Sequence, residues 1–410
     1  MKKICVLPFM HTLIQPDGNI KLCCNSKNEE QMPNVSDVSI KNILNNPHHI
    51  KIRQEMMQGK QPDACSQCWK NESLGIESYR QQQFYTYPHY LLRVLNTKDG
   101  VINAGVKYLD VRFNNTCNLK CVMCSSEYST AWIDDERKLL ESGNQELRNI
   151  MNYRVEHYDK ESYKWSKDRS IFNSIVENSI ALERLHFAGG EPLLSKLHVP
   201  LLKELIVNGT SKKLYLSYNT NGEFIDQELL DLWANFKRVK IFYSLDQIQE
   251  KNEYIRYPSK WGKNLETFDL IETSSPKNVE WKLLSTIGAL NIFYIPEFVD
   301  WKLSMNFKKI HNDWLDGGIG YAKPIYFPTY LNAGVLPFEF KQAVATRLRS
   351  YTTQLPKRYH KEYKKIIKEN IDFMYNEDNS KELPVLKSYL TNLDKIRGTD
   401  FKKTFPDLPL

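Results

Sequence analysis

Residues 117–124 read Cys-Asn-Leu-Lys-Cys-Val-Met-Cys, so three cysteines fall within eight positions at C-x3-C-x2-C spacing. A structural zinc site, or an iron–sulfur cluster that only moves electrons, usually takes four protein ligands. A set of three ligands leaves one metal position open. This stretch therefore predicts a metal site at which a substrate or cofactor completes the coordination. A zinc ion with a distant fourth ligand is the alternative that the spacing leaves open.

The three-cysteine stretch follows a predicted strand directly, at the end where parallel α/β sheets place their chemistry. Downstream, strand-like runs alternate with helical patterns such as 195–209 and 226–236, which favours a parallel sheet with right-handed crossovers. Six such units predict an α/β fold with a partial (β/α)6 barrel rather than a closed eightfold one. The predicted strands are 106–113, 182–190, 213–222, 239–246, 279–290 and, more weakly, 325–328.

C-x3-C-x2-C after the first strand of a partial barrel resembles the radical S-adenosylmethionine (SAM) superfamily. The resemblance implies that Cys117, Cys121 and Cys124 hold three irons of a [4Fe–4S] cluster, while SAM chelates the fourth. One electron from the reduced cluster would then cleave SAM to a 5′-deoxyadenosyl radical, which abstracts a substrate hydrogen. One residue departs from the pattern, because Met123 stands where the family often has an aromatic residue. Methionine can also pack against a ring.

Motifs at later strand ends resemble the SAM-binding parts of this family. The Gly-Gly-Glu-Pro motif at 189–192 resembles the segment that holds the SAM amino group, because paired glycines allow close approach and a carboxylate accepts ammonium hydrogen bonds. Segments 218–222, 244–256 and 288–291 resemble the parts that meet the rest of the cofactor, the last on its adenine side. Plain turns, an ordinary strand end and a surface ion pair are the alternatives. The implied SAM contacts are Gly189, Gly190, Glu191, Pro192, Asn219, Asn221, Ser244, Asp246 and Arg256.

The other five cysteines also lie near the N-terminus, and none of the eight occurs after residue 124. Such clustering favours metal ligands over a disulfide scaffold. A C-x12-G-x4-C pattern followed by a later C-x2-C resembles the twitch domain, a shortened relative of the SPASM domain that carries auxiliary clusters. The family usually places this module after the barrel, whereas here it precedes it. The resemblance implies four ligands for an auxiliary [4Fe–4S] cluster: Cys5, Cys23, Cys65 and Cys68.

Cys24 is the spare cysteine in this assignment. The alternative is a zinc site that uses Cys23, Cys24, Cys65 and Cys68. Adjacent cysteines rarely both turn toward one ion, so the iron–sulfur interpretation is favoured. Full ligation by protein suits electron transfer, because no position is left for a substrate.

Bulk properties limit the classes of partner. The net charge of +7 is mild for 410 residues. The densest basic stretch, 357–370, has apolar residues at near-helical spacing, which favours a solvated helix face over a nucleic-acid patch. No apolar run approaches membrane-spanning length, and the N-terminal run is broken by Pro8, so we expect a cytoplasmic protein. The predicted domains are a cysteine module at 1–100, a barrel at 101–335 and a helical extension at 336–410.

The sequence thus predicts a radical SAM enzyme whose auxiliary cluster assists oxidation or coupling of a peptide or protein substrate. A small-molecule dehydrogenase, a non-catalytic iron–sulfur carrier or scaffold, and an RNA-modifying enzyme are the alternatives. A flavodoxin or ferredoxin is the expected electron donor by analogy. The sequence indicates no catalytic base, because its many aspartates and tyrosines form no diagnostic constellation.

Overall fold

The computed structural model describes residues 3–27, 32–73, 75, 77–157, 165–310 and 322–410. The chain forms two compact units, each assembled from separate segments of sequence. Unit 1 comprises residues 1–115, 161–218 and 231–239, and unit 2 comprises residues 116–160, 219–230 and 240–410. Strands β5 (Tyr215–Thr220) and β6 (Arg238–Ser244) each have residues in both units.

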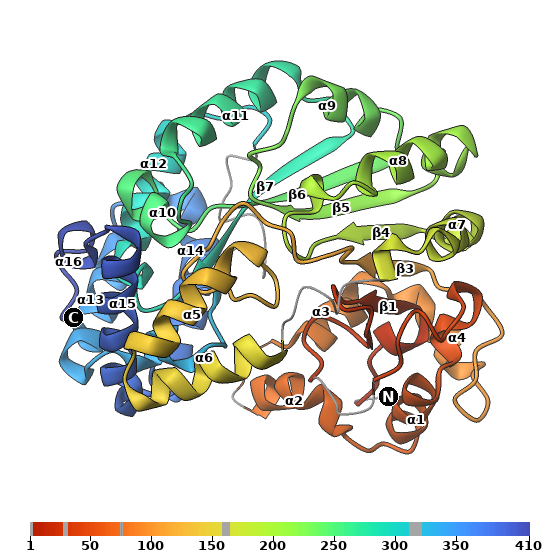
Figure 1. The fold of residues 1–410 in the computed structure, drawn as a ribbon, viewed down its shortest axis with the longest axis horizontal. Coiled ribbons are helices and arrows are strands. Elements are labelled where there is room, and N and C mark those ends of the chain that lie inside the picture. The colour runs from red at the N-terminus through yellow and green to blue at the C-terminus, as the bar shows by residue number, and fades with distance from the viewer. Residues whose placement is uncertain (1–2, 28–31, 74, 76, 158–164, 311–321) are drawn as a thin grey trace. The chain divides into compact units, whose positions relative to one another are not determined.

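Unit 1 is built on neighbouring strands in the order β2-β1-β3-β4-β5 (Figure 1). Strands β1 and β2 form an antiparallel hairpin that turns at residues 15–19. β1 also pairs in parallel with β3, with His11 opposite Tyr108, and β3, β4 and β5 continue in parallel. The remaining strand bounds are β1 (His11–Ile14), β2 (Ile20–Lys21), β3 (Tyr108–Val111) and β4 (Arg184–Phe187).

The two faces of the β3-β4-β5 sheet differ in character, because successive strand residues point to opposite sides. One face is apolar and buried. On it the ring of Phe187 lies 5.1 Å from that of His198 in helix α8. The opposite face carries the polar residues Tyr108, Asp110, Arg184, His186 and Ser217. The helices of unit 1 are α1 (Pro47–Met57), α2 (Ser66–Ser73), α3 (Tyr79–Thr86), α4 (Leu91–Leu95), α7 (Arg169–Asn178) and α8 (His198–Val207).

Helix α1 begins at a proline. A proline inside a helical pattern usually interrupts the helix, but Pro47 is the first residue of α1. Asn46 caps this helix, because its side chain accepts a hydrogen bond from the amide of His49. Proline suits the first helical position, where its missing N–H has no partner to lose.

Unit 2 holds the end of the parallel sheet and most of the helices. Its strands neighbour one another in the order β6-β7-β8, with β7 at Val279–Ile287 and β8 at Ala322–Pro324. The weak sixth strand was therefore predicted about three residues late, and the proline at 324 ends it. The helices are α5 (Ile133–Ser142), α6 (Gln145–His157), α10 (Gln249–Ile255), α11 (Trp261–Ser274), α12 (Ile295–Ser304), α13 (Phe338–Tyr351), α14 (His360–Asn376), α15 (Leu383–Arg397) and α16 (Phe401–Thr404). Helix α9 (Gln227–Trp233) has residues in both units.

The region of the predicted helical extension contains α13 to α16. Helix α14 buries Tyr363, Ile366 and Ile367 and exposes its lysines, as expected for the basic stretch. Between β3 and β4 the chain forms α5, α6 and α7, while residues 158–164 lie outside the described part. Among the described helices, none is both long and apolar enough to cross a membrane.

Gly222, just after β5, offers a test of packing in unit 2. Its φ is +78°, and an added Cβ would lie 1.9 Å from Cε2 of Tyr243. Gly209 has a similar φ of +76° with nothing within 4 Å of an added Cβ. We expect Gly209→Ala to cost about 1 kcal/mol of unfolding free energy, from the backbone alone. Gly222→Ala adds a clash and should cost about 2–4 kcal/mol. Urea unfolding measures both, and equal losses would contradict the packing described.

Candidate functional site

The loop that carries three cysteines, residues 117–124, lies in unit 2 and is held at its backbone. The amide of Lys120 donates to the carbonyl of Tyr257 at 2.6 Å, and the amide of Val122 donates to the carbonyl of Ile255 at 2.7 Å. These two acceptors lie at the end of α10 and just beyond it. Lys120 and Val122 therefore pair with one segment, as residues of neighbouring strands do. This pairing fixes the backbone on both sides of Cys121.

The three thiols of the loop are close enough for their charges to interact. Burial raises the pKa of Cys124, and the neighbouring thiols of Cys121 and Cys117 raise it further. Burial also raises the pKa of Cys121, against the opposing effect of Arg256. Three gathered thiolates therefore need compensating positive charge, which the irons of a cluster supply when bound.

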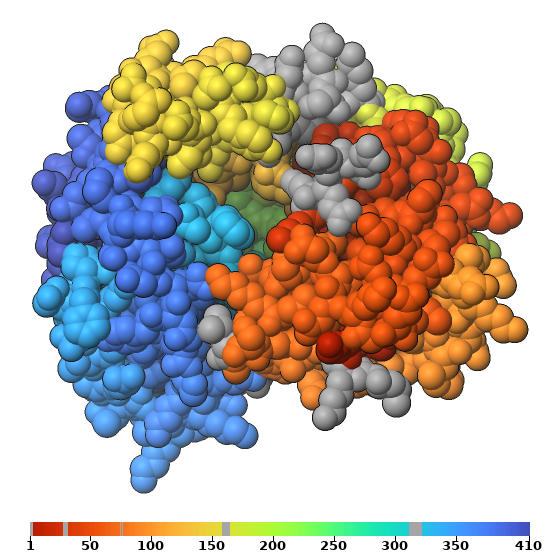
Figure 2. Space-filling view, turned by 90° about the horizontal axis from the view of Figure 1, so that it is seen from below, coloured from red at the N-terminus to blue at the C-terminus, as the bar shows by residue number. Residues whose placement is uncertain are grey.

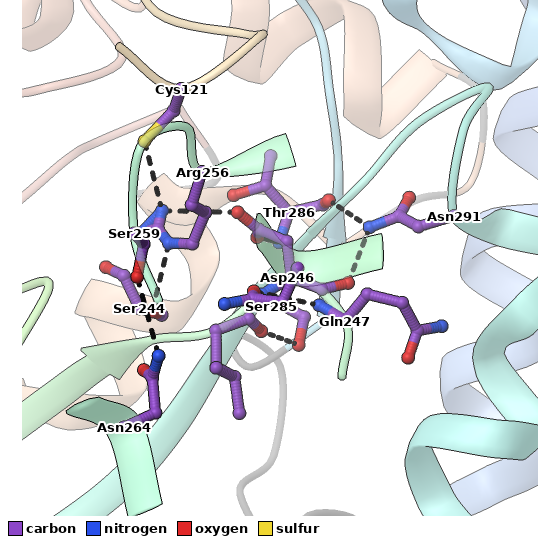
Figure 3. A network of polar contacts seen from close by, with 12 residues as sticks. Cys121, Ser244, Asp246, Gln247, Arg256, Ser259, Asn264, Ser285, Thr286 and Asn291 are labelled. Atoms are coloured by element: carbon purple, nitrogen blue, oxygen red, sulfur yellow. Dashed lines mark hydrogen bonds and ion pairs between the residues drawn. The ribbon is translucent and has the colours of Figure 1, made fainter. Parts of the chain in front are cut away.

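Arg256 connects the cysteine loop to the end of β6 (Figure 3). Its Nη1 donates to Sγ of Cys121 at 3.7 Å and to Oδ2 of Asp246 at 3.2 Å, while its Nε donates to the carbonyl of Ser244 at 3.1 Å. Nη2 has no partner among the residues that the structure describes. One edge of the guanidinium is thus fixed by protein, and the other can bind an anion.

Asp246 is held in turn by the neighbouring strand. Its Oδ1 accepts from the amide of Thr286 at 2.7 Å, and its carbonyl accepts from Nδ2 of Asn291 at 2.9 Å. Burial raises the pKa of Asp246, and the charge of Arg256 lowers it. Both carboxylate oxygens are therefore occupied, which makes Asp246 a holder of Arg256 rather than a free base.

A mostly apolar pocket lies beside the loop in unit 2. Met123 and all four residues of segment 288–291 line it, which places the unusual methionine and the predicted adenine-side segment at one cavity. Thr286 and Asn291 are its polar members. The complete lining is Val122, Met123, Ile255, Thr286, Gly288, Ala289, Leu290, Asn291, Ile325 and Leu331.

The two asparagines after β5 differ in their bonding. Nδ2 of Asn221 donates to Oδ1 of Asn118 at 2.9 Å, and Asn118 donates to Glu223 at 2.6 Å. Asn221 therefore braces the residue next to Cys117. Asn219 is half-buried, and its side chain makes no hydrogen bond within the described part of the chain.

The Gly-Gly-Glu-Pro motif lies in unit 1, just past β4. Gly189 has a φ of +114°, and an added Cβ would lie 2.9 Å from Cβ of Arg112, so glycine is required there. Glu191 is buried, and its side chain accepts from the amide of Leu193. Pro192 begins the short turn that follows. The motif forms a tight strand-to-turn connection whose carboxylate is partly used as a cap.

Four cysteines of unit 1 also gather. Cys5 precedes β1 and Cys23 follows β2, so the hairpin returns the chain to the end from which it started. Burial raises the pKa of Cys23 well above its usual value, and the nearby thiols of Cys24, Cys65, Cys68 and Cys5 add to the effect. Burial raises the pKa of Cys5 to about 12.

The neighbourhood of these thiols contains a buried cation. Arg80 donates to the carbonyl of Ile4 at 2.8 Å and to Glu72 at 2.7 Å, and its charge lowers the pKa of Cys5 against burial. Cys24 is exposed; burial of its thiol raises its pKa, Arg112 lowers it, and Asp110 and Cys68 raise it.

Comparison with known proteins finds two family matches, one over each region that contains a cysteine set. Residues 111–280 match the radical SAM superfamily, and residues 5–69 match SPASM, an iron–sulfur cluster-binding domain. Residues 111–280 therefore form a radical SAM domain. This radical SAM protein has its SPASM domain at the N-terminus, and its fold is the α/β partial barrel of that superfamily, as predicted. Its cofactors are [4Fe–4S] clusters and SAM.

Individual relatives are distant. An uncharacterized protein of Methanocaldococcus jannaschii is 22% identical over 214 residues, which are 52% of this chain and 63% of that protein. SuiB of Streptococcus suis bound to S-adenosylmethionine shares 12% identity over 77% of this chain and 62% of its own, with a TM-score of 0.35. Native anSMEcpe with bound AdoMet shares 17% identity over 50% of each chain, with a TM-score of 0.35. The radical SAM protein thus spans half to two-thirds of the length of these proteins.

The donor chemistry of the two cysteine sets fits iron–sulfur clusters, whose irons are bound by thiolates. Thiols in each set influence one another's pKa, and the charges of Arg256 and Arg80 act on Cys121 and Cys5.

The polar face of the unit 1 sheet is a set of residues that the sequence interpretation missed. Asp110 stands opposite His186 in the β3–β4 register, and His186 bonds to Ser217 at 2.8 Å. Asp110 is buried, and its Oδ1 has no hydrogen-bond partner among the described residues, with Nε of Arg112 3.7 Å away. The sequence signal for this face was the alternation of polar and apolar residues in Tyr-Leu-Asp-Val-Arg, residues 108–112. The sequence interpretation used this alternation only to predict a strand.

The titration of Asp110 should appear in the pH dependence of stability. Burial raises its pKa, against Arg112, His11 and Arg184, so the folded state binds the proton more tightly than the unfolded state. Stability is then lost as pH rises from the unfolded pKa of 3.8 through the folded value. We expect Asp110→Asn to gain unfolding free energy relative to wild type as pH rises above the unfolded pKa of 3.8.

Asp168 is the matched control. Its pKa is lowered by hydrogen bonds from Ser170, so its contribution is present above pH 3.8 and lost as pH falls. Asp168→Asn should therefore lose stability relative to wild type at neutral pH. Urea unfolding across the pH range measures both variants, and a flat difference for Asp110→Asn would contradict the raised pKa.

Proposed function

We propose that Cys117, Cys121 and Cys124 hold the SAM-binding [4Fe–4S] cluster, and that SAM lies between this loop and the apolar pocket. The contact of Arg256 with Cys121, at the edge of a pocket lined by Met123 and segment 288–291, supports this most directly. When bound there, the reduced cluster supplies the electron that splits SAM into methionine and a 5′-deoxyadenosyl radical, which removes a hydrogen atom from the substrate.

Residues of the chain have distinct parts in this proposal. Arg256 offsets the charge of Cys121 and offers its free Nη2 to the SAM carboxylate. Asp246 fixes the guanidinium, and the hydroxyl of Ser244 and the amide of Asn219 are the proposed contacts of the ribose or carboxylate. Met123 and the residues around Gly288 enclose the adenine and keep water from it.

The tight turn at 189–192 is the proposed contact of the SAM ammonium group. Glycine at 189 allows this tight turn, because a side chain at that position would clash with Arg112. The carboxylate of Glu191 and nearby carbonyls can accept ammonium hydrogen bonds. Gly190 and Pro192 shape the turn, and Asn221 contributes by bracing Asn118 beside Cys117.

The auxiliary cluster is proposed on Cys5, Cys23, Cys65 and Cys68. The thiols of Cys65, Cys68 and Cys5 each raise the pKa of Cys23, which supports one shared group, and Cys24 is the spare cysteine in this proposal. Ligation by four thiolates leaves no open iron, which suits uptake of the electron that remains on the substrate after hydrogen abstraction.

The proposed substrate is a peptide or protein side chain that undergoes oxidation or radical coupling. Dehydrogenation of a small molecule is the alternative. A flavodoxin or ferredoxin is the proposed electron donor. Coexpression with short reading frames that neighbour the gene distinguishes the substrates, because net oxidation of a peptide removes two hydrogen atoms and lowers its mass. Unchanged peptides together with oxidation of an added alcohol would favour the small-molecule alternative.

Cluster variants test the assignment. Anaerobically reconstituted protein, given SAM and a strong reductant, should form 5′-deoxyadenosine above the control without enzyme. Cys121→Ala should lower that formation at least about 100-fold, because the cluster loses a ligand. Cys68→Ala should keep SAM cleavage and lose only auxiliary iron. Formation by Cys121→Ala, or none by iron-replete wild type with candidate substrates, would favour a carrier or scaffold.

Arg256 offers a binding test. Arg256→Met should weaken SAM binding about 10- to 100-fold, because a charge-assisted hydrogen bond and the fixed cation are both lost. Arg256→Lys keeps the charge but not the fork and should lie between. Equilibrium dialysis with labelled SAM measures the affinity, and Arg347→Met, in a half-exposed pair with Glu297, is the control. Unchanged affinity in Arg256→Met would remove this residue from the SAM site.

A further inference from the structure

Helix α15 of the C-terminal extension contacts the three-cysteine loop, although that extension carries no motif. The hydroxyl of Tyr389 donates to the carbonyl of Val122 at 2.7 Å. Val122 lies between the second and third cysteines, and both residues are fully or almost fully buried. The contact joins residues 267 positions apart in the sequence.

The ring of Tyr389 is fixed by aromatic neighbours. It stacks on Trp132 with ring centroids 6.3 Å apart and planes at 14°. The indole Nε1 of Trp132 donates to the carbonyl of Cys121 at 3.1 Å. Two adjacent loop carbonyls, of Cys121 and Val122, thus accept hydrogen bonds from two stacked side chains. Burial raises the pKa of Tyr389 well above its usual value, so the phenol remains a donor.

The end of α15 makes a second connection to the loop. Nε of Arg397 donates to Oδ2 of Asp135 at 2.9 Å, and Oδ1 of Asp135 accepts from Nζ of Lys120 at 2.8 Å. The side chains of Arg397 and Asp135 are 3% and 2% exposed. One buried carboxylate on α5 therefore links the last residue of α15 to the spacer between the first two cysteines. A charge so deeply buried destabilises the fold if its partner is removed.

Cation–π contacts complete this connection. The guanidinium of Arg397 lies 4.5 Å from the ring centroid of Trp132 and 5.0 Å from that of Tyr257. These rings belong to the residues whose side-chain N–H and backbone carbonyl also bind the loop. Figure 2 shows the helices α5 and α6, in yellow, lying against the C-terminal helices, in blue.

We propose that Tyr389 and Arg397 are positioning residues for the SAM-binding cluster, and that α15 clamps the loop which carries it. This inference rests on the proposed function, because it requires a cluster on Cys117, Cys121 and Cys124. The clamp keeps the spacing between the second and third cysteines and closes the loop against water and oxygen. Loops held by few contacts open locally, and a cluster is lost from the opened state.

The test variant is Tyr389→Phe, which keeps the ring and removes the hydroxyl. The buried carbonyl of Val122 then lacks its donor, so the open state should rise about five- to tenfold. After anaerobic reconstitution, the iron–sulfur absorbance should bleach in air faster by the same factor. The electron paramagnetic resonance spectrum of the reduced protein should also show a weaker change on addition of SAM.

Tyr363→Phe is the matched control. Tyr363 is 0% exposed, lies on α14 of the same extension, and its hydroxyl has no hydrogen-bond partner among the described residues. The same substitution there should leave the bleaching rate and the SAM-dependent spectrum as in wild type. Equal bleaching rates for the two variants would overturn the clamp.

Arg397 provides a second route if Tyr389→Phe does not fold. Arg397→Met removes the partner of Asp135 and should accelerate bleaching, whereas Arg397→Lys keeps the ion pair and should restore most of the protection. No difference between these two would also overturn the proposal. A wild-type spectrum that does not respond to SAM would instead remove the proposed function, so the two failures are distinguishable.

Discussion

The gathering of three thiolates inside the protein is the constraint on which unit 2 depends. Burial and mutual repulsion both oppose the charged form of Cys124, and they act as long as no metal offsets them. Two features of the fold counter this cost. Hydrogen bonds hold the backbone of the loop, and the charge of Arg256 lowers the pKa of Cys121. The loop pairs with the end of α10, and Arg256 reaches Cys121 from the residue that follows this helix. Asp246 then holds Arg256, and the amide of Thr286 holds Asp246.

This chain of contacts explains why the candidate site combines local and distant sequence. The spacing of the cysteines is local, so the sequence predicts it well. The strands were also predictable, because β-branched and aromatic runs between helical patterns are a local signal. The polar face of β3 was not recognised, since its meaning depends on the register with β4 that places Asp110 opposite His186. The contact of Tyr389 with Val122 spans 267 positions and leaves no local pattern.

Two prolines show the same limit of prediction from sequence at the ends of single elements. Pro47 begins α1 because Asn46 caps the helix, and Pro324 ends β8. Either proline reads as an interruption when the sequence is taken alone, since its effect depends on which backbone N–H groups need partners. Sequence reasoning therefore located the elements and misplaced some of their ends.

The position of the SPASM domain before the barrel follows from the pairing of β1. This strand runs parallel to β3, and parallel neighbours cannot be joined by a tight turn, so a long connection must lie between them. Residues 15–107 form that connection, and they carry Cys23, Cys65 and Cys68, while Cys5 precedes β1. The iron–sulfur module is therefore the crossover between two strands of one sheet. It covers the edge that β3 would otherwise expose, and its placement in unit 1 is fixed by backbone hydrogen bonds rather than by a flexible linker.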